Sequence, residues 1–201
     1  MPYYRFEMEY IDLKLQDADV LYYPQVFNST ESQKYFKVLL KEIQWQQDNI
    51  KIFGKTYEQP RLTALYGNNQ KPYSYSNIIM HPLVFTPSLL EIKERIENIV
   101  QTTFTTCLLN LYRNGQDSNG WHADDEKELG NNPTIASISF GEERIFHLKH
   151  KIEKKHKHKL ILKNGSLLIM KGATQHYWKH QLPKTKKKMS KRINLTFRYI
   201  K

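Results

Sequence analysis

Two residues in the stretch GWHADDEKELG, residues 120–130, have the types and the spacing of metal ligands. His122 and Asp124 lie two positions apart, so in an extended chain both side chains project from the same face. A histidine and a carboxylate supply two ligands of a facial triad, and a second histidine from a distant strand would complete it. Such a triad holds non-haem Fe(II) and leaves positions open for a co-substrate and dioxygen. The H-x-D spacing also occurs by chance in many proteins, where both side chains only face solvent.

A second pattern lies in RINLTFRYI, residues 192–200. Apolar residues alternate there with Arg192, Asn194, Thr196 and Arg198. Two guanidinium groups on one face of a strand can close on a small dicarboxylate, because arginine binds carboxylates in a bidentate manner. In the stretch LLNLYR, residues 108–113, Asn110 and Tyr112 share a face and add neutral hydrogen-bonding groups. An ordinary half-exposed strand would show the same alternation.

The chain of 201 residues is strongly basic, with 31 Lys and Arg against 20 Asp and Glu and a net charge of +11. This excess indicates a polyanionic partner, nucleic acid first and an acidic membrane surface second. Much of the charge lies in KIEKKHKHK, residues 151–159, and PKTKKKMSKR, residues 183–192. Either stretch alone is typical of a solvated loop, but together they predict salt-sensitive phosphate contacts. A functional metal site at His156 and His158 is disfavoured, because the surrounding lysines repel cations.

Cysteine usage and hydropathy limit the compartment. The one cysteine, Cys107, lies in the apolar run CLLNLY, which predicts a small buried core residue. A single cysteine excludes an internal disulfide framework and suits a reducing compartment. No apolar run approaches the length of a membrane span, and MPYYRFEMEY is too polar for a signal peptide. We expect an intracellular protein, cytoplasmic or nuclear, with no membrane partner and monomeric by default.

Hydrophobic periodicity predicts two helices followed by strands. Residues 29–45 have helical spacing, with Thr30 and Gln33 as a capping box, and residues 86–100 follow Thr86 as a cap. After residue 103 the period changes to two and about seven short strands follow, with Asn164-Gly165 predicting a type I′ hairpin turn. The pattern indicates a mainly β fold with flanking helices, either a sandwich or a jelly roll.

Several motifs together resemble the AlkB family of Fe(II)- and 2-oxoglutarate-dependent nucleic-acid demethylases. From about residue 50 onward they occur in the family's order: PRLTALYG, YSYS, NLYRNGQDSNGWHADDE, IASISFG, GSLLIMKGATQHYWKHQLP and RINLTFR. The resemblance implies a single catalytic domain over residues 1–201 with a double-stranded β-helix, or jelly-roll, fold. Residues 104–201 would form the jelly-roll core with the iron and 2-oxoglutarate site. Residues 1–103 would form an N-terminal helical and nucleotide-recognition part.

The resemblance also implies the ligands of iron and of 2-oxoglutarate. His122 and Asp124 would bind iron, and the third ligand is either His176 or His180, which share strand parity. In the family this histidine is followed by one residue, an aliphatic residue and often proline, so HQLP selects His180. Arg192 would pair with the distal carboxylate of 2-oxoglutarate and Arg198 with the carboxylate beside the keto group. The full set of 2-oxoglutarate contacts would be Asn110, Tyr112, Arg192, Asn194 and Arg198.

The implied activity is oxidative demethylation of 1-methyladenine and 3-methylcytosine in DNA, with RNA left open as a substrate. Fe(II), 2-oxoglutarate and dioxygen would convert the co-substrate to succinate and carbon dioxide, and the methyl group would leave as formaldehyde. The protein's part is to position the substrate and to exclude water. One alternative is a hydroxylase of a protein or small molecule, which would not need the basic surface. The other is a non-catalytic binder of modified nucleic acid, which would not need complete ligands.

The acids beside the triad are expected to face the substrate. The methylated bases are cationic, and a carboxylate bonded to their exocyclic amino group would favour them over unmodified bases. Asp125 and Glu126 are the candidates, although they could instead solvate a turn, or Asp125 could pair with a nearby arginine.

Four further residues are expected at the flipped base, which must leave the stack to reach the metal. Tyr73 and Tyr75 in KPYSYS match positions that line the lesion pocket in the family, and core packing is their alternative. Arg61 in QPRLTALYG would lie nearby. Phe53 in IKIFGK resembles the family's apolar wedge that fills the gap in duplex DNA, or is an ordinary hairpin residue.

Overall fold

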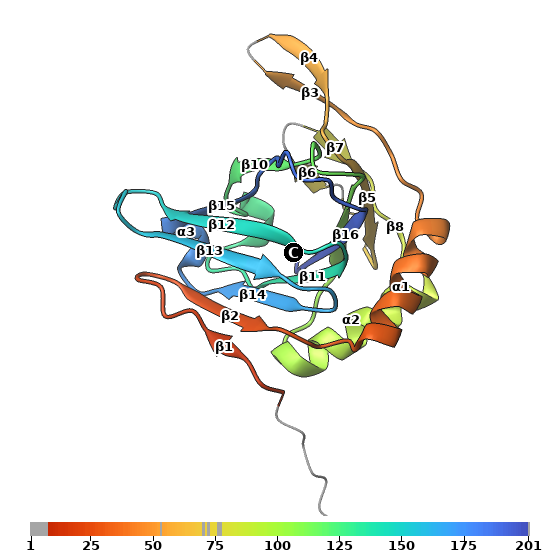
Figure 1. Ribbon diagram of the computed structural model, residues 1–201, viewed down its shortest axis with the longest axis horizontal. Helices are drawn as coiled ribbons and strands as arrows, with labels where there is room; N and C mark the ends of the chain where they lie inside the picture. The colour runs from red at the N-terminus through yellow and green to blue at the C-terminus, as the bar shows by residue number, and fades with distance from the viewer. Residues whose placement is uncertain (1–7, 53, 70, 72, 76–77, 201) are drawn as a thin grey trace, which may run out of the picture.

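An eight-stranded sheet forms the centre of the computed structural model, which describes residues 8–52, 54–69, 71, 73–75 and 78–200 (Figure 1). Its neighbouring strands are antiparallel, apart from the parallel pair at one edge. In spatial order they are β1 (Ile11–Asp12), β2 (Asp19–Tyr23), β14 (Leu167–Lys171), β11 (Ile135–Gly141), β16 (Arg192–Arg198), β9 (Thr106–Tyr112), β5 (Leu62–Gly67) and β8 (Leu83–Val84).

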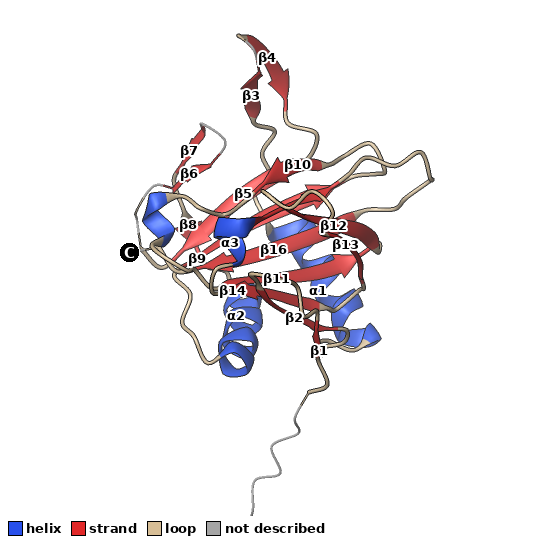
Figure 2. Cartoon of the chain, turned by 90° about the vertical axis from the view of Figure 1, so that its left-hand side faces the viewer, coloured by secondary structure: helices blue, strands red, loops and turns tan. Residues whose placement is uncertain are grey.

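A four-stranded sheet faces the larger one. Its strands, in spatial order, are β10 (Asn119–His122), β15 (Trp178–Leu182), β12 (Arg144–His150) and β13 (Lys157–Leu162). Apolar side chains of both sheets pack together between them, among them Leu108, Phe146, Leu162 and Met170. Two hairpins lie outside these sheets, and the first projects well away from them (Figures 1 and 2): β3 (Asn49–Ile52) with β4 (Lys55–Glu58), and β6 (Tyr73–Tyr75) with β7 (Ile78–Met80).

Helices α1 (Ser29–Glu42) and α2 (Pro87–Val100) pack on the outer face of the larger sheet (Figure 2). Their buried stripes contact the outward side chains of β9, β11, β14 and β16 in one apolar core. The fold is therefore mainly β with flanking helices and has the two facing sheets of a jelly roll, as predicted. In the part of the chain that the structure describes, no helix has the length and apolar character needed to cross a bilayer.

The helix starts show one correct and one wrong prediction. Thr86 caps α2 as expected, because its side-chain oxygen accepts a hydrogen bond from the backbone N–H of Leu89 at 3.3 Å. The capping box of α1 is not Thr30 with Gln33. Asn28 is the cap, and its side chain and that of Glu31 accept each other's backbone N–H at 3.0 and 2.9 Å. The cap therefore lies two residues before the one expected.

The predicted hairpin at Asn164-Gly165 is also wrong. β13 pairs with β12 in the smaller sheet, whereas β14 pairs with β11 and β2 in the larger one. Gly165 does take a positive φ of 78°, its N–H donates to the carbonyl of Ser139, and its own carbonyl accepts from Val26 and Phe27. The dipeptide thus moves the chain from one sheet to the other.

Strand β16 shows how the larger sheet serves two environments. Ile193, Leu195 and Phe197 join the core under the helices, while the alternate residues line a pocket between the sheets. All seven residues of the strand are buried, so this is not a half-exposed strand. Tyr199 lies beyond the strand and is 46% exposed. Cys107 on the neighbouring strand β9 is fully buried, as predicted.

Candidate metal and co-substrate site

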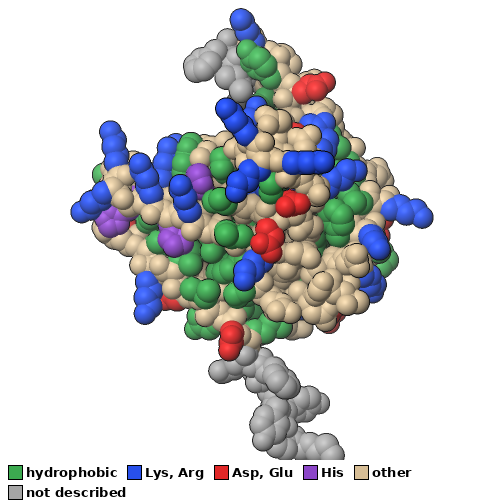
Figure 3. Space-filling model, in the orientation of Figure 1, with side chains coloured by type: hydrophobic (Ala, Val, Ile, Leu, Met, Phe, Trp, Pro, Cys, Tyr) green, Lys and Arg blue, Asp and Glu red, His purple; other side chains and the backbone are tan. Residues whose placement is uncertain are grey.

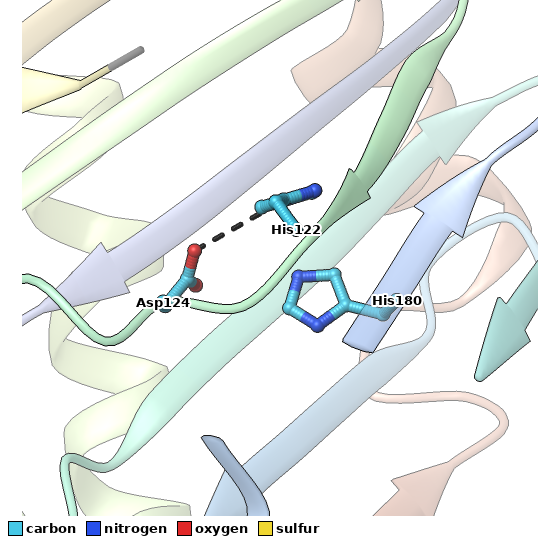
Figure 4. Close-up of side chains that lie close together, drawn as sticks. All are labelled: His122, Asp124 and His180. Carbon is cyan, nitrogen blue, oxygen red and sulfur yellow. Dashed lines mark ion pairs between the residues drawn. The ribbon is translucent and has the colours of Figure 1, made fainter. Parts of the chain in front are cut away.

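The side chains of His122, Asp124 and His180 converge between the two sheets (Figure 4). His122 is the last residue of β10, Asp124 follows two positions later, and His180 lies on β15 directly opposite His122. One potential ligand atom of each lies within 4.8 Å of the others. The spacing of two residues therefore places both first ligands on one side, and strand pairing adds the third.

The proton on His122 is placed by its neighbours. Its Nδ1–H donates to the carbonyl oxygen of Gly120 at 2.8 Å, and a carbonyl can only accept. The lone pair is then on Nε2, which lies 3.9 Å from Oδ1 of Asp124. A backbone carbonyl that holds the far nitrogen is the usual arrangement for a metal-binding histidine.

Asp124 is almost completely buried, at 1% exposed, and is tied down on one side. Its Oδ2 accepts a hydrogen bond from Nη2 of Arg198 at 3.0 Å. Among the described residues, Oδ1 has no hydrogen-bond donor although it is fully buried. Burial would raise the pKa of Asp124, but Arg198 and the two histidines lower that pKa to about 2. A charged, buried carboxylate oxygen without a donor fits a cation.

Both histidines are held in the neutral form that a metal needs. Burial, with His122 alongside, lowers the pKa of His180 to about 3, and burial also lowers the pKa of His122. The ring of Phe146 stacks on His180 with 5.3 Å between ring centroids. Two neutral imidazoles and one carboxylate are the donor set of non-haem Fe(II) centres. The residues present therefore fit Fe(II).

One pocket joins these three residues to the inward faces of β9 and β16. All five residues expected to contact 2-oxoglutarate line it: Asn110, Tyr112, Arg192, Asn194 and Arg198. The remaining lining residues were not expected: Leu108, Asn119, Ser137, Phe146, Met170, Leu182 and Thr196. The alternation in RIFHLKH, which puts Phe146 and Leu148 on one face, was the signal available for Phe146.

Arg192 is buried in this pocket, at 2% exposed. Its Nη2 donates to Oγ of Ser139 at 2.8 Å, and its guanidinium carbon lies 5.3 Å from the ring centroid of Tyr112. No carboxylate lies within 4.0 Å of it among the residues described, and burial lowers its pKa to about 10. A buried guanidinium without a protein carboxylate is suited to the carboxylate of a ligand.

Both asparagine side chains in the pocket are fixed by hydrogen bonds. Nδ2 of Asn194 donates to Oγ of Ser137 at 2.8 Å and to the carbonyl of Ile138 at 3.0 Å. Oδ1 of Asn110 accepts from Nε of Arg61 at 2.7 Å. Arg61, expected at the substrate, is thus buried and connected to a residue expected at the co-substrate.

His176 lies elsewhere. It belongs to the short helix α3 (Thr174–Tyr177), so it does not share strand parity with His180, and that expectation is wrong. Its side chain is exposed, and Nε2–H donates to Oδ1 of Asn132 at 3.0 Å. Of the two candidates, only His180 is grouped with His122 and Asp124.

The remaining expected substrate residues are partly visible. Asp125 is exposed and pairs with Nζ of Lys151 at 3.0 Å, so its cationic partner is a lysine and not an arginine. Glu126 is half-buried. Tyr73 and Tyr75 form the ends of β6, but their side chains lie outside the described residues, as does Phe53 entirely.

The sequence of this chain is similar to those of several known proteins. A family model described as the 2OG-Fe(II) oxygenase superfamily matches residues 19–198. The alpha-ketoglutarate-dependent dioxygenase alkB homolog 3 of Bos taurus is 41% identical over 186 residues, which cover 88% of this chain and 64% of the relative. The DNA oxidative demethylase ALKBH2 of Homo sapiens is 35% identical over 188 residues, which cover 89% of this chain and 72% of the relative.

The solved structure of OsALKBH1 has the same fold, with a TM-score of 0.70 at 14% identity, over 95% of this chain and all of that one. Of the bovine alkB homolog 3, by contrast, this chain spans slightly less than two thirds of the length. Enzymes of the matched family use Fe(II) and 2-oxoglutarate. The two imidazoles and one carboxylate of His122, His180 and Asp124 suit Fe(II). The chain belongs to the 2OG-Fe(II) oxygenase superfamily and, within it, to the AlkB family of dioxygenases.

Proposed function

We propose that this protein is an oxidative demethylase that repairs N-alkylated bases, 1-methyladenine and 3-methylcytosine, in DNA and, as an open second substrate, in RNA. The observation that carries the proposal is the pocket in which the buried triad and a buried arginine without a carboxylate partner lie together. The similarity to relatives named DNA oxidative demethylase supports nucleic acid as the substrate.

In this proposal His122, Asp124 and His180 would hold Fe(II), and residues of β9 and β16 that line the pocket would bind 2-oxoglutarate. Arg192 would pair with the distal carboxylate, and Asn110 and Tyr112 would donate hydrogen bonds to the molecule. Asn194, whose amide N–H groups already donate to Ser137 and Ile138, would line the site beside it. Arg198 contacts the other carboxylate while it keeps Asp124 charged. When bound, Fe(II), 2-oxoglutarate and dioxygen supply the oxidation of the methyl group, which then leaves as formaldehyde, with succinate and carbon dioxide as co-products.

The protein itself contributes the positioning of the co-substrate and the exclusion of water from the site. Leu108, Met170 and Leu182 are buried at the pocket wall, and they exclude water from the ligands. The fixed amide of Asn194 and the fixed ring of His122 leave few orientations to be lost when the co-substrate binds. The site is thus arranged before its ligands arrive.

The substrate base is proposed to enter from the side of the two hairpins. Tyr73 and Tyr75 would stack on it, Asp125 or Glu126 would accept from its exocyclic amino group, and Phe53 would occupy the gap in a duplex. Arg61 would support this side through Asn110. We assign residues 104–201 to the core and residues 1–103 to nucleotide recognition within one catalytic domain, although β1, β2, β5 and β8 belong to the same large sheet.

The charged surface supports a polyanionic partner. Lysine and histidine side chains gather over β12 and β13 and their connection, at the left of Figure 3. The groove there is lined by Trp121, His147, Lys149, Lys151, Lys154, Lys157, His158, Lys159 and Lys179, with no acidic side chain among its lining residues. Such a surface attracts the phosphates on either side of a flipped nucleotide.

The test is formaldehyde release from oligonucleotides that carry 1-methyladenine or 3-methylcytosine, single- and double-stranded, with Fe(II), 2-oxoglutarate and ascorbate. Release by the wild type, abolished in His180→Ala, is expected. Slow consumption of 2-oxoglutarate without turnover of any oligonucleotide would leave the metal site standing and refute the nucleic-acid assignment. Under that result a protein or small-molecule substrate becomes the better hypothesis.

A further inference from the structure

The backbone at Asp124 is held by a side chain from another part of the fold. β10 ends at His122, so the N–H of Asp124 is outside the strand ladder. It donates to Oε1 of Gln175 at 2.9 Å, and Gln175 is 1% exposed. This contact anchors the backbone of Asp124, because the strand pairing that fixes His122 does not extend to it.

Gln175 lies in α3, in the connection that leads from β14 to β15. His180 follows five residues later, on β15. A single short segment therefore carries one ligand and holds the backbone of another. Nε2 of Gln175 faces the sulfur of Met170 at 3.8 Å, which leaves Oε1 turned towards Asp124.

Lys151 closes the arrangement from outside. Its Nζ donates to the backbone carbonyl of Gln175 at 2.8 Å and to Oδ2 of Asp125 at 3.0 Å. The two consecutive aspartates are thus both connected to Gln175, Asp124 through the backbone and Asp125 through the lysine. Lys151 is partly buried, at 24% exposed, whereas its neighbour Lys154 in the same loop is exposed.

We propose that Gln175 is a positioning residue of the metal site, which sets the reach of Asp124 towards the metal, and that Lys151 secures the same segment through Asp125. This inference rests on the proposed metal site but not on the nucleic-acid substrate. Asp124 Oδ2 is directed by Arg198, and the backbone N–H by Gln175, so the carboxylate is fixed from both ends. Oδ1 of Asp124, which accepts no hydrogen bond from the described residues, then faces the histidines.

The physical reason is that metal affinity is higher when the protein's ligand side chains are already fixed, because less conformational freedom is lost when the metal binds. Residues that orient metal ligands are typically worth 10- to 100-fold in metal affinity. Loss of the Gln175 bond leaves the Asp124 backbone free to move while the donor set stays complete. Metal affinity should therefore fall although no ligand has been removed.

The experiment is calorimetric titration of the full chain with Mn(II) alone, for the wild type, Gln175→Leu and Gln175→Asn. Asparagine keeps the amide but withdraws its oxygen from Asp124. Both variants are expected to bind Mn(II) about tenfold more weakly, with Lys151→Met between them and the wild type. Gln181→Leu, on the outer face of the smaller sheet beside His147, and Lys154→Met are matched controls with unchanged affinity.

A readout on the wild type keeps the proposal testable if the variants fold poorly. The amide of Asp124 should exchange slowly with solvent, as a hydrogen-bonded N–H does, and it should exchange fast in Gln175→Asn. Wild-type Mn(II) affinity in the Gln175 variants, or fast exchange in the wild type, would overturn the positioning role. A wild type that binds Mn(II) no better than His122→Ala would instead refute the metal site itself.

Discussion

Nη2 of Arg198 lies 3.0 Å from Oδ2 of Asp124, and the two side chains are 5% and 1% exposed. This buried ion pair connects the C-terminal strand of the larger sheet to the residue that follows the edge strand of the smaller one. The opposite sign of the two charges lets both remain ionised away from water. Arg198 therefore has a structural role even before any co-substrate is bound.

Replacement of Arg198 by methionine should leave the carboxylate of Asp124 buried without its cation. Removal of one partner from a buried pair typically costs about 3–5 kcal/mol of unfolding free energy. Urea denaturation of the metal-free protein measures this change. The control is Lys171→Met, whose pair with Asp19 is 40% and 48% exposed and should be worth less than about 1 kcal/mol. Equal losses in the two variants would show that the Arg198 pair does not stabilise the fold.

The metal-free protein should lose stability as pH falls from about 6.5. The pKa of His180 is lowered to about 3 when folded, so between these values the unfolded imidazole binds a proton and the folded one does not. The unfolding free energy then decreases by up to about 1.4 kcal/mol for each pH unit from this group. Asp124, with a pKa lowered to about 2, adds to the loss below about pH 4.

The measurement is the unfolding free energy of chelator-treated protein from pH 4.5 to 7. His180→Leu removes the titrating group, so its stability should depend less steeply on pH across this range. Parallel curves for the wild type and the variant would contradict the neutral, buried state of His180.

Arg192→Met should weaken binding of 2-oxoglutarate without changing the affinity for the metal. The guanidinium is expected to pair with a carboxylate of 2-oxoglutarate, and a charge-assisted pair in a buried site is worth about 1.5–3 kcal/mol. Affinity for 2-oxoglutarate should therefore fall roughly 10- to 100-fold in calorimetry, by the same energies. Mn(II) affinity should not change, because Arg192 contacts Ser139 and Tyr112 and none of the three ligands.

Arg192→Lys tests geometry against charge. A lysine keeps the positive charge but not the planar pair of donors, so an intermediate affinity is expected. Wild-type affinity for 2-oxoglutarate in Arg192→Met would remove this residue from the co-substrate site.

Loss of the lysines in the β12–β13 connection should weaken binding to unmodified single-stranded DNA. The change is Lys154, Lys155 and Lys157 to serine, and fluorescence anisotropy at several salt concentrations measures it. Each lost phosphate contact should reduce the slope of log affinity against log salt by about 0.7. The same substitutions at Lys34, Lys37 and Lys41 on α1, which packs behind the larger sheet, are the control of equal charge. An equal effect of both triple variants would indicate general attraction and no preferred face.

Residue spacing was sufficient to predict that His122 and Asp124 lie close together, because such a pattern reports a local geometry. The spacing of His122 and Asp124 matches the two-residue repeat of an extended chain, although Asp124 lies just beyond β10. The alternation of β16 follows the same repeat. Pairing of His180 with His122 is a contact across 58 positions, for which the family resemblance and not the spacing was needed. The sequence alone left His176 equally possible, because the turn of helix at α3 has no strong capping signal.

What the sequence did not predict depends on contacts between distant segments. Strands β1 to β8 precede residue 103, where periodicity predicted only two helices. β5 shows no alternation of buried and exposed residues, because five of its six residues are buried. The Asn164-Gly165 turn has the expected glycine conformation, but its flanking strands find partners in different sheets. Gln175 gave no signal at all, since a glutamine becomes an anchor only when Asp124 is folded against it.

The place of β16 in the larger sheet has a consequence for synthesis of the protein. It lies between β11 and β9, and in chain order it follows every other described strand. On a ribosome that has not yet released residues 192–198, the sheet consists of two separate halves, β1-β2-β14-β11 and β9-β5-β8. Neither Arg192 nor Arg198 is then available, so the pocket between the sheets is complete only when this strand has paired with both halves.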